Sequence, residues 1–531
     1  MQSNDEQLLG QSPQSLVASL PARVSTPLFQ RALAAPDSPA LRDQAGHTLT
    51  YAELAAAVRA AQQQLVNLGI TTGDRVLLVN ENCLPLLVLI LALSELGAWP
   101  VVVNARMAAG EIERIRIHSQ PRLVLYLLDS AAAASHFIAA AADQTLVCRE
   151  LELAGGQVGI CVFEVGEDND EGKLSEQGVF TLIYTTGTTG DPKGVMLTHR
   201  NMLYVAAVSG ALRGLKAEDK IYLVLPVSHV FGISAVFLAA IYAGAELIIA
   251  DRFDPALSFS GFEHQGISGI FGVPAMFAKL VDFAREQGIS KADHKRLWPR
   301  LRFMYSGGAP LDPAIKEKTE KLFGLPLLNG YGMTESGPTI CQVRFNEPLD
   351  NCSVGRPLPG MEVRLIGTDG RKVMPGEVGE LHVRGPNIMA GYYRNPSATA
   401  AAINAEGFLN TGDMVRLDEQ GNVHIAGRSK ELIIHSGFNV YPPEVEGVIS
   451  KHPEVLLCAV VGETVDGNEN VIAYVQRTSG SELSATALQA YIKPLLTAYK
   501  RPSRIEFMEP LPTAPSGKVL KHKLRYTDKA H

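Results

Sequence analysis

The sequence is poor in cysteine and tryptophan and has no long block of charge of one sign. Its 531 residues include six Cys and two Trp, and the formal net charge is −7. Without a basic block, we do not expect nucleic acid as a partner. The cysteines contain no CxxC pair, so neither a disulfide framework nor a zinc site is indicated, and a reducing cytoplasm fits their use. They stand at positions 83, 148, 161, 341, 352 and 458.

The usual targeting signals are also lacking. The first ten residues, MQSNDEQLLG, are polar and acidic, unlike a secretory signal, and the chain does not end in a peroxisomal tripeptide. One apolar stretch, residues 83–103, could suggest a membrane span, but Glu95 and two prolines interrupt it. It predicts a buried helix followed by a buried strand. We therefore expect a cytoplasmic protein without stable membrane insertion.

What the sequence does have is apolar, β-branched runs that alternate with helical patterns. Hydrophobic residues make up 46% of the chain and charged residues 19%, which is ordinary for a globular protein, and the length indicates more than one domain. The alternation predicts an α/β fold with largely parallel sheets. Expected strands include 75–79, 100–104, 123–128, 221–225 and 246–250, and expected helices include 51–68, 131–142 and 274–286.

The pattern changes after about residue 350. Short strands are then separated by turns at 367–370 and 418–421, which favours an antiparallel, β-rich segment. From about Lys430 a smaller α+β module begins. We therefore predict an α/β protein with a large N-terminal domain, residues 1–429, of mostly parallel sheets plus a β-rich subdomain. A small C-terminal α+β domain, residues 430–531, follows it.

The most informative stretch is residues 184–194, Tyr-Thr-Thr-Gly-Thr-Thr-Gly-Asp-Pro-Lys-Gly. A β-prone run precedes it, which predicts a strand followed by a Gly-rich loop. Glycines let the backbone approach an anion, and Thr hydroxyls and a Lys donate hydrogen bonds to phosphate oxygens. The order differs from a Walker A loop. The residues alone leave open a phosphate loop or a plain surface turn. The candidate ligands are Thr185, Thr186, Gly187, Thr188, Thr189, Gly190 and Lys193.

A second motif, residues 329–336, reads Asn-Gly-Tyr-Gly-Met-Thr-Glu-Ser. An aromatic ring between glycines can present its face to a purine, a Thr can donate to phosphate, and a Glu can hold Mg²⁺. A tight turn with a solvated Glu would explain the same residues. The candidates are Asn329, Gly330, Tyr331, Gly332, Thr334 and Glu335.

Three further residues have an ordinary explanation when each is taken alone. Asp413, in Thr-Gly-Asp, and Arg428, fifteen residues later, could bind the hydroxyls of a ribose, although an Asp in a turn is usually a turn former. Lys518 lies in Pro-Ser-Gly-Lys near the end of the chain, where a solvated Lys-rich tail would also fit.

In their order, these motifs resemble those of the adenylate-forming superfamily, which contains acyl-CoA synthetases, luciferases and the adenylation domains of peptide synthetases. The resemblance is strongest to acyl-CoA synthetases and extends from about Phe29 to Arg525. It implies that ATP, Mg²⁺ and coenzyme A bind, with Tyr331 on the adenine, Thr334 on the α-phosphate and Glu335 on the metal. It also implies adenine contacts from Gly308, Ala309 and Pro310 and ribose contacts from Asp413 and Arg428.

The same resemblance gives roles to the C-terminal part of the chain. Lys518 would bridge carboxylate and α-phosphate oxygens during adenylation. Lys430 would be the hinge about which the small domain turns, and Gly437 would meet the pantetheine arm of coenzyme A after that turn. From the residues alone, Lys430 could equally be a solvated loop residue.

The resemblance also bears on the acid. His229 stands where acyl-CoA synthetases carry a gate beside the acyl pocket. No acidic residue lies between Lys220 and Glu246 to hold an amino group, which argues against an amino-acid substrate. By analogy the pocket would include the apolar or small residues Phe231, Ala235, Gly330, Pro338 and Thr339.

The resulting hypothesis is an ATP-dependent carboxylic acid–CoA ligase that works through an acyl-adenylate and releases AMP and pyrophosphate. Its acid would be an aryl, medium-chain or longer fatty acid. Two alternatives remain open: an acyl-AMP ligase that loads a free carrier protein, and a catalytically silent nucleotide-binding regulator. The expected partners are a small carboxylic acid and coenzyme A, and the protein would be a monomer or a homodimer.

Overall fold

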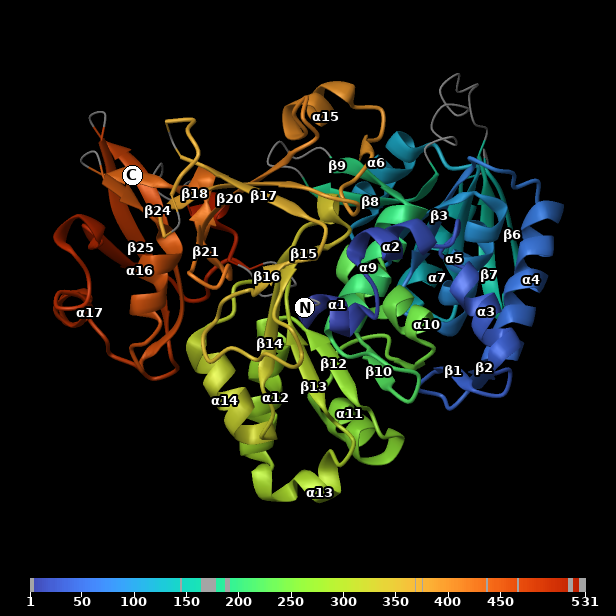
Figure 1. The fold of residues 1–531 in the computed structure, drawn as a ribbon, viewed down its shortest axis with the longest axis horizontal. Coiled ribbons are helices and arrows are strands. Elements are labelled where there is room, and N and C mark those ends of the chain that lie inside the picture. The colour runs from blue at the N-terminus through green and yellow to red at the C-terminus, as the bar shows by residue number, and fades with distance from the viewer. Residues whose placement is uncertain are drawn as a thin grey trace.

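A computed structural model gives the fold of the chain (Figure 1). It describes residues 4–143, 146–163, 178–186, 192–367, 369–374, 376–435, 438–465, 468–513 and 519–524. Several predicted site residues lie outside this set, namely Gly187, Thr188, Thr189, Gly190, Gly437 and Lys518.

A first large sheet contains, in order, β19 (Gly391–Tyr392), β9 (Pro192–Thr198), β8 (Val179–Thr186), β4 (Trp99–Asn104), β3 (Arg75–Asn80), β5 (Leu123–Leu127), β7 (Gly156–Val162) and β6 (Val147–Leu153). β3 pairs in parallel with β4 and β5, and β3 is buried along its whole length. Within β3, Val76 and Leu78 join one hydrophobic core, while Leu77 and Val79 join another. The continuous apolar run therefore reflects a strand that is covered on both faces.

A second large sheet contains, in order, β16 (Arg356–Pro357), β15 (Thr339–Gln342), β14 (Leu327–Gly332), β13 (Phe303–Ser306), β12 (Gly269–Gly272), β10 (Lys220–Leu223), β11 (Glu246–Ile249), β1 (Pro39–Arg42) and β2 (Thr48–Thr50). Its central strands, from β14 to β1, run parallel. Their carboxyl ends therefore meet at one edge of the sheet. The predicted strands at 221–225 and 246–250 correspond to β10 and β11.

Helices connect the strands, as the periodicity predicts. α4 (Tyr51–Asn67) begins with a capping box, in which the side chains of Thr50 and Glu53 each bond the other's backbone N–H. α5 (Leu84–Leu96), the apolar stretch that could suggest a membrane span, is buried over most of its length and leads into β4. Within the part of the chain that the structure describes, no helix is both long and apolar enough to cross a membrane.

The remaining helices and helical turns of the N-terminal part lie between and beside these strands (Figure 1). They are α1 (Asn4–Leu9), α2 (Pro13–Ser19), α3 (Thr26–Ala34), α6 (Ala109–Ser119), α7 (Ala131–Ala141), α9 (His199–Leu212), η1 (Phe231–Leu238), α10 (Ala239–Ala243), α11 (Pro255–Ser260), η2 (Gly261–Gln265), α12 (Pro274–Glu286), η3 (Lys291–Asp293), α13 (His294–Leu297), α14 (Pro313–Phe323), η4 (Thr334–Ser336) and α15 (Pro396–Ala402).

The β-rich segment after residue 350 is confirmed as antiparallel. It forms a sheet of β17 (Glu362–Ile366), β18 (Val378–Arg384), β20 (Leu409–Leu417) and β21 (Val423–Arg428). The turn at 418–421 joins β20 to β21, and a hydrogen bond from Asp418 N–H to Asn422 O at 3.0 Å closes it.

The C-terminal part is an α+β module with a core of its own. It lies at one end of the molecule, opposite β6 and α4 (Figure 1). Its elements are η5 (Ser429–Glu431), β22 (Ile433–His435), β23 (Phe438–Val440), α16 (Pro442–Ile449), β24 (Val455–Val465), β25 (Asn468–Arg477), α17 (Ala485–Ile492), η6 (Ala498–Lys500), β26 (Arg504–Phe507) and α18 (Lys521–Leu524). The boundary between residues 429 and 430 falls within η5 and stays a prediction.

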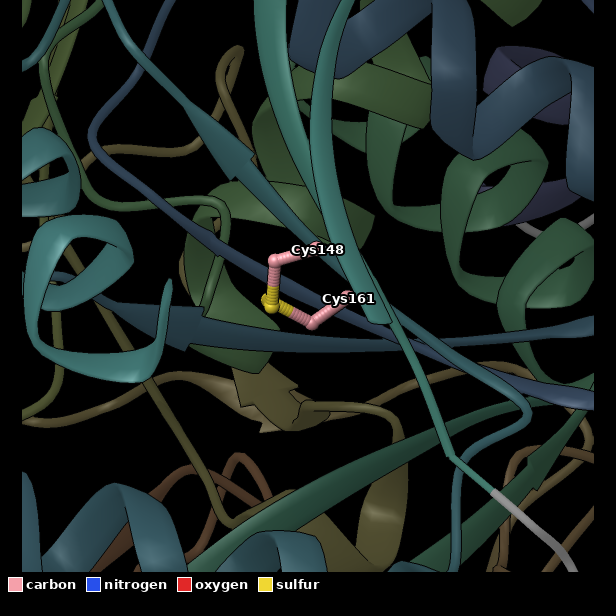
Figure 2. Close-up of a disulfide and its surroundings, with 2 residues drawn as sticks. All are labelled: Cys148 and Cys161. Atoms are coloured by element: carbon pink, nitrogen blue, oxygen red, sulfur yellow. A yellow bond between two sulfur atoms is a disulfide. The ribbon is translucent and has the colours of Figure 1, made fainter. Parts of the chain in front are cut away.

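The expectation that the cysteines form no disulfide is wrong for one pair. Cys148 in β6 and Cys161 in β7 face each other in an antiparallel hairpin, with Cα atoms 4.2 Å apart, and their sulfur atoms are bonded (Figure 2). Such a pairing depends on the register of two neighbouring strands, which cysteine spacing without a CxxC motif does not reveal.

Candidate active site

The predicted adenine-side residues gather at the carboxyl edge of the second sheet. β13 and β14 pair in parallel with Ser306 opposite Asn329. The segment with Gly308, Ala309 and Pro310, which follows β13, therefore lies beside the end of β14. Gly308 has φ +76°, a left-handed conformation that favours glycine. In α/β sheets this edge is where ligands bind.

The end of β14 is shaped by close backbone approach. A Cβ on Gly332 would lie 1.7 Å from Pro338 O, and Met333 N–H donates to that same oxygen at 3.0 Å. Glycine is therefore required at 332. The Asn329 side chain accepts a hydrogen bond from Gly330 N–H at 3.0 Å and donates to Cys352 O at 3.1 Å. Asn329 thus holds the turn in place.

Tyr331, Asp413 and Arg428 form one hydrogen-bonded group. The Tyr331 hydroxyl donates to Asp413 Oδ2, and Arg428 Nε donates to Asp413 Oδ1 at 2.7 Å. The register of β20 and β21 sets Asp413 opposite Arg428. Burial, followed by the charge of Asp413, raises the pKa of Tyr331 well above its usual value, so the hydroxyl stays protonated and can donate. A buried carboxylate beside a half-exposed guanidinium suits the hydroxyls of a ribose.

Glu335 and Lys193 are linked through Tyr392. Glu335 is buried in η4, and the Tyr392 hydroxyl donates to its Oε1 at 2.8 Å. The Lys193 ammonium lies 5.2 Å from the centroid of the Tyr392 ring. Burial, followed by the charge of Glu335, raises the pKa of Tyr392, so this hydroxyl is also neutral at physiological pH. The link connects the predicted metal-binding carboxylate with Lys193, one of the predicted phosphate ligands.

The surroundings of Glu335 fit a magnesium ion. Among the described residues, the hydrogen bond from Tyr392 is the only side-chain interaction of the Glu335 carboxylate, and it engages Oε1. Oε2 therefore has an open coordination position. In the same part of the chain no cluster of three or more His, Cys, Asp or Glu could hold a metal. One carboxylate together with substrate phosphates is how proteins commonly bind Mg²⁺. Thr334 is buried next to Glu335 in the same turn.

The predicted acyl-pocket residues meet between η1 and the segment after η4. Ser234 Oγ donates to Gly337 O at 2.7 Å, which holds η1 against Pro338 and Thr339. A Cβ on Gly307 would lie 3.1 Å from the Phe231 ring and 3.5 Å from Gly330 O. Phe231 and Gly330, together with Gly307, therefore converge. Ala235, one turn further along η1, is fully buried.

His229 precedes η1. Its Nδ1 accepts a hydrogen bond from Phe231 N–H at 3.2 Å. The residue is exposed, yet the protein around the imidazole desolvates it and lowers its pKa below the usual value. A neutral imidazole at the start of the pocket helix fits the predicted gate.

The two strands that flank the predicted phosphate loop in sequence pair with each other. β8 and β9 form a hairpin in which Thr185 lies opposite Lys193 and Thr186 opposite Pro192. The Tyr184 hydroxyl lies 2.7 Å from His118 Nδ1, and a Cβ on Gly194 would lie 3.1 Å from the Tyr184 ring. Tyr184 therefore links β8 to α6 and packs against β9.

The predicted hinge residue is placed where a pivot could act. Lys430 is exposed in the short turn η5, directly after β21. Its neighbour Glu431 already belongs to the C-terminal module, because its Oε2 accepts from Lys521 Nζ at 2.9 Å. The roles of Lys430, Gly437 and Lys518 stay predictions.

Tyr392 and Tyr184 contact predicted site residues or their strands, but the sequence motifs do not indicate either tyrosine. Tyr392 stands in Gly-Tyr-Tyr-Arg-Asn-Pro, and a Gly followed by two aromatic residues was the available signal. Tyr184 opens the Thr- and Gly-rich stretch, but it is not among the candidate phosphate ligands. Both tyrosines act through residues distant in sequence, which the motifs alone do not reveal.

Comparison with known proteins identifies the family. Residues 28–393 match the model of the AMP-binding enzymes, and residues 444–518 match that of the AMP-binding enzyme C-terminal domain. The feruloyl-CoA synthase of an Amycolatopsis species is 32% identical over 93% of this chain and 97% of its own length. The 4-coumarate–CoA ligase 2 of Oryza sativa subsp. japonica is 31% identical over 94% and 91%, respectively.

A solved structure with the same fold is O-succinylbenzoate coenzyme A synthetase from Bacillus subtilis, in complex with ATP and magnesium ion. It superimposes with a TM-score of 0.77, is 28% identical and covers 94% of this chain and 98% of that one. The chain described here therefore belongs to the AMP-binding enzymes, the adenylate-forming superfamily.

Proposed function

We propose that this AMP-binding enzyme joins an aryl carboxylic acid to coenzyme A in two steps, with ATP as co-substrate. The observation that carries the proposal is the joining of Tyr331, Asp413 and Arg428 into one group at the carboxyl edge of the sheet. The names of the relatives, feruloyl-CoA synthase and 4-coumarate–CoA ligase, support an acid–CoA ligase and favour an aryl acid.

In the first step a carboxylate oxygen of the acid bonds to the α-phosphorus of ATP, the bond to the bridging oxygen breaks, and pyrophosphate leaves. Asp413 and Arg428 hold the ribose, and Tyr331 contacts the adenine. Lys193 and the loop that begins at Thr185 contact the phosphates. When bound at Glu335, Mg²⁺ supplies positive charge beside the phosphates. Catalysis thus rests on positioning and charge stabilisation.

In the second step the coenzyme A thiol attacks the carbonyl carbon of the acyl-adenylate. A carbon–sulfur bond forms, the carbon–oxygen bond to AMP breaks, and the thiol proton is released to solvent. For this step the C-terminal module turns about Lys430, which withdraws Lys518 from the site and admits the thiol.

The test is an assay of pyrophosphate release with a panel of carboxylic acids, followed by detection of the CoA thioester. We expect release that requires both ATP and an aryl acid. Lys518→Ala should lower that release by about 10²–10³-fold, the effect of losing one preorganised donor, and should spare thioester formation from supplied acyl-adenylate. A protein that binds ATP but releases no pyrophosphate with any acid would instead be a nucleotide-binding regulator.

The acceptor separates this proposal from its main alternative. With coenzyme A the acyl-adenylate should be consumed and a thioester should accumulate. If the adenylate forms but only a free carrier protein consumes it, the chain is an acyl-AMP ligase, and the adenylation half of the proposal stands.

A further inference from the structure

Arg213 is a buried arginine with unused hydrogen-bond donors. It follows the last residue of α9 and is 3% exposed. Its Nη1 donates to Ala235 O at 2.9 Å, and its Nε is buried without a partner. Among the described residues, no carboxylate forms an ion pair with it. A guanidinium carries five N–H donors, and the hydrogen bond to Ala235 O uses one of them.

Two other buried arginines of this chain differ sharply from Arg213. Arg75 donates to three backbone carbonyls, those of Gly73, Ser119 and Gln120. Arg344 pairs with Asp5 and also donates to the carbonyls of residues 342, 356 and 357. Acceptors within the protein thus satisfy both of these arginines. Arg213 therefore calls for a different explanation.

Aromatic rings join Arg213 to the proposed acyl pocket. The guanidinium carbon lies 5.1 Å from the ring centroids of both Phe271 and Tyr305. The Phe271 ring packs edge to face against Phe231, with centroids 6.4 Å apart. Since Phe231 and Ala235 are proposed pocket residues, Arg213 borders that pocket through its hydrogen bond to Ala235 O and its contact with the Phe271 ring. The Tyr305 hydroxyl already donates to Val343 O at 2.7 Å, which leaves the guanidinium as the open donor.

The charge of Arg213 persists despite its burial. Desolvation lowers its pKa to about 10, which still leaves the guanidinium protonated at neutral pH. A buried charge with few hydrogen bonds is costly in free energy, and an acceptor from a ligand would recover part of that cost.

We propose that Arg213 determines acid specificity by binding an oxygen acceptor at the end of the acid remote from the reacting carboxylate. The aromatic rings of Phe231, Phe271 and Tyr305 suit an aryl body, and the guanidinium suits an oxygen substituent on it. The substrate class is therefore an aryl acid with a hydroxyl or carboxylate at its far end. This inference rests on the proposed function, because it places Arg213 in the pocket of that reaction.

The experiment compares matched acids: cinnamate, 4-hydroxycinnamate and 4-carboxycinnamate, with the corresponding benzoate series as a shorter frame. Because hydrogen bonds to charged groups are stronger than neutral ones, the wild type should favour an oxygen-bearing acid over its parent by about 10- to 100-fold in kcat/KM. Arg213→Met should bring that ratio close to one. Since the ratio is taken within one variant, it does not depend on the folded fraction.

Arg302→Met is the matched control. Arg302 also packs over two aromatic rings, those of Phe303 and Phe345, but its guanidinium is paired with Asp219. The acid ratio of this variant should equal that of the wild type. If Arg213→Met does not fold, the acid ratios of Arg213→Lys and of the wild type still test the proposal. Lys keeps the charge, so Arg213→Lys should retain part of the preference for the oxygen-bearing acid.

The inference is overturned if the wild type prefers the parent acids, or if the ratio survives in Arg213→Met. If pyrophosphate is released without a preference for oxygen-bearing acids, only the role proposed for Arg213 is contradicted. Absence of release with every acid removes the proposed function as well, so the two failures are distinguishable.

Discussion

At the scale of single residues, charged groups of the site are held by neutral tyrosines. Tyr331 donates to Asp413, and Tyr392 donates to Glu335. Burial and the neighbouring carboxylate raise both tyrosine pKa values, so each hydroxyl remains a donor. We infer that Tyr392 is a positioning residue, which keeps the Glu335 carboxylate oriented toward the phosphates.

Tyr392→Phe tests this role. The variant keeps the ring under Lys193 but loses a hydrogen bond to a charged acceptor, so binding of Mg·ATP should weaken by about 10- to 100-fold. Calorimetric titration of ATP at several Mg²⁺ concentrations measures the loss. Glu335→Gln alone should reduce the metal dependence, and the double variant should be little worse than Glu335→Gln because both changes act at one carboxylate. Additive losses would contradict the assignment.

His199 gives the protein a predicted pH dependence of stability. Its Nδ1 accepts from Val24 N–H at 3.3 Å, and burial, followed by the charge of Arg23, lowers its pKa to about 4. The unfolded histidine binds a proton near its ordinary pKa of about 6.5, so the unfolded state gains the proton first as the pH falls. The free energy of unfolding should therefore contain the full contribution of neutral His199 above about pH 6.5. It should decline toward pH 4, by up to about 3 kcal/mol.

Urea unfolding at pH 7.0 and pH 4.5 measures this decline. His199→Asn removes the titrating group, so its stability should change less between the two pH values than that of the wild type. Equal changes in both proteins would show that other groups carry the pH dependence.

At the scale of elements, the hairpin of β6 and β7 is fastened by Cys148–Cys161. β6 lies at the end of its sheet, and the bond closes a short segment with a sequence separation of 13. Closing a loop of this size restricts the unfolded chain and contributes about 3 kcal/mol in the chain-entropy treatment.

Reduction should therefore lower the thermal midpoint of the wild type. The variant with Cys148→Ser and Cys161→Ser should melt at the lower temperature whether or not dithiothreitol is present. Mass spectrometry with a thiol-alkylating reagent reports the state of the pair. If the cysteine pair is shown to be reduced and the thermal midpoint of the wild type is unchanged, the expected contribution of the disulfide to stability is contradicted.

At the scale of the whole molecule, the C-terminal module has its own core and follows the N-terminal part through η5. Glu431 is already bound to Lys521 of that module, whereas Arg428 is bound to Asp413 of the N-terminal part. The contacts of the chain thus change from the N-terminal part to the C-terminal module within three residues. We therefore propose that Lys430, exposed between them, is the pivot for backbone rotation.

Lys430→Pro tests this hinge. Proline fixes φ near −65° and removes a backbone donor, so it should oppose rotation between two domain arrangements. If the adenylating arrangement accepts that φ, acyl-adenylate formation without coenzyme A should survive better than thioester formation from supplied adenylate. Equal losses, together with a lowered thermal midpoint, would point to general damage. Unchanged rates in both steps would place the pivot elsewhere.

The sequence by itself determined the family and the broad architecture. Continuous apolar runs such as 75–79 and 100–104 became buried strands, because a strand covered on both faces has no polar side to show. The order of motifs around Tyr331, Asp413 and Lys518 predicted an adenylate-forming enzyme of the acid–CoA ligase class, and the comparisons confirm it. Each strand and each motif is local, so neighbouring residues suffice to specify it.

Only the tertiary structure decided which distant side chains meet. Cys148 pairs with Cys161 because of strand register. Tyr392 reaches Glu335 across 57 positions, and nearby Met389 N–H donates to Glu335 O at 2.9 Å. The unused donors of Arg213 likewise become visible only when α9, η1 and β12 are packed together. Hydrogen bonding and burial are properties of packed neighbours, and no spacing along the chain encodes them directly.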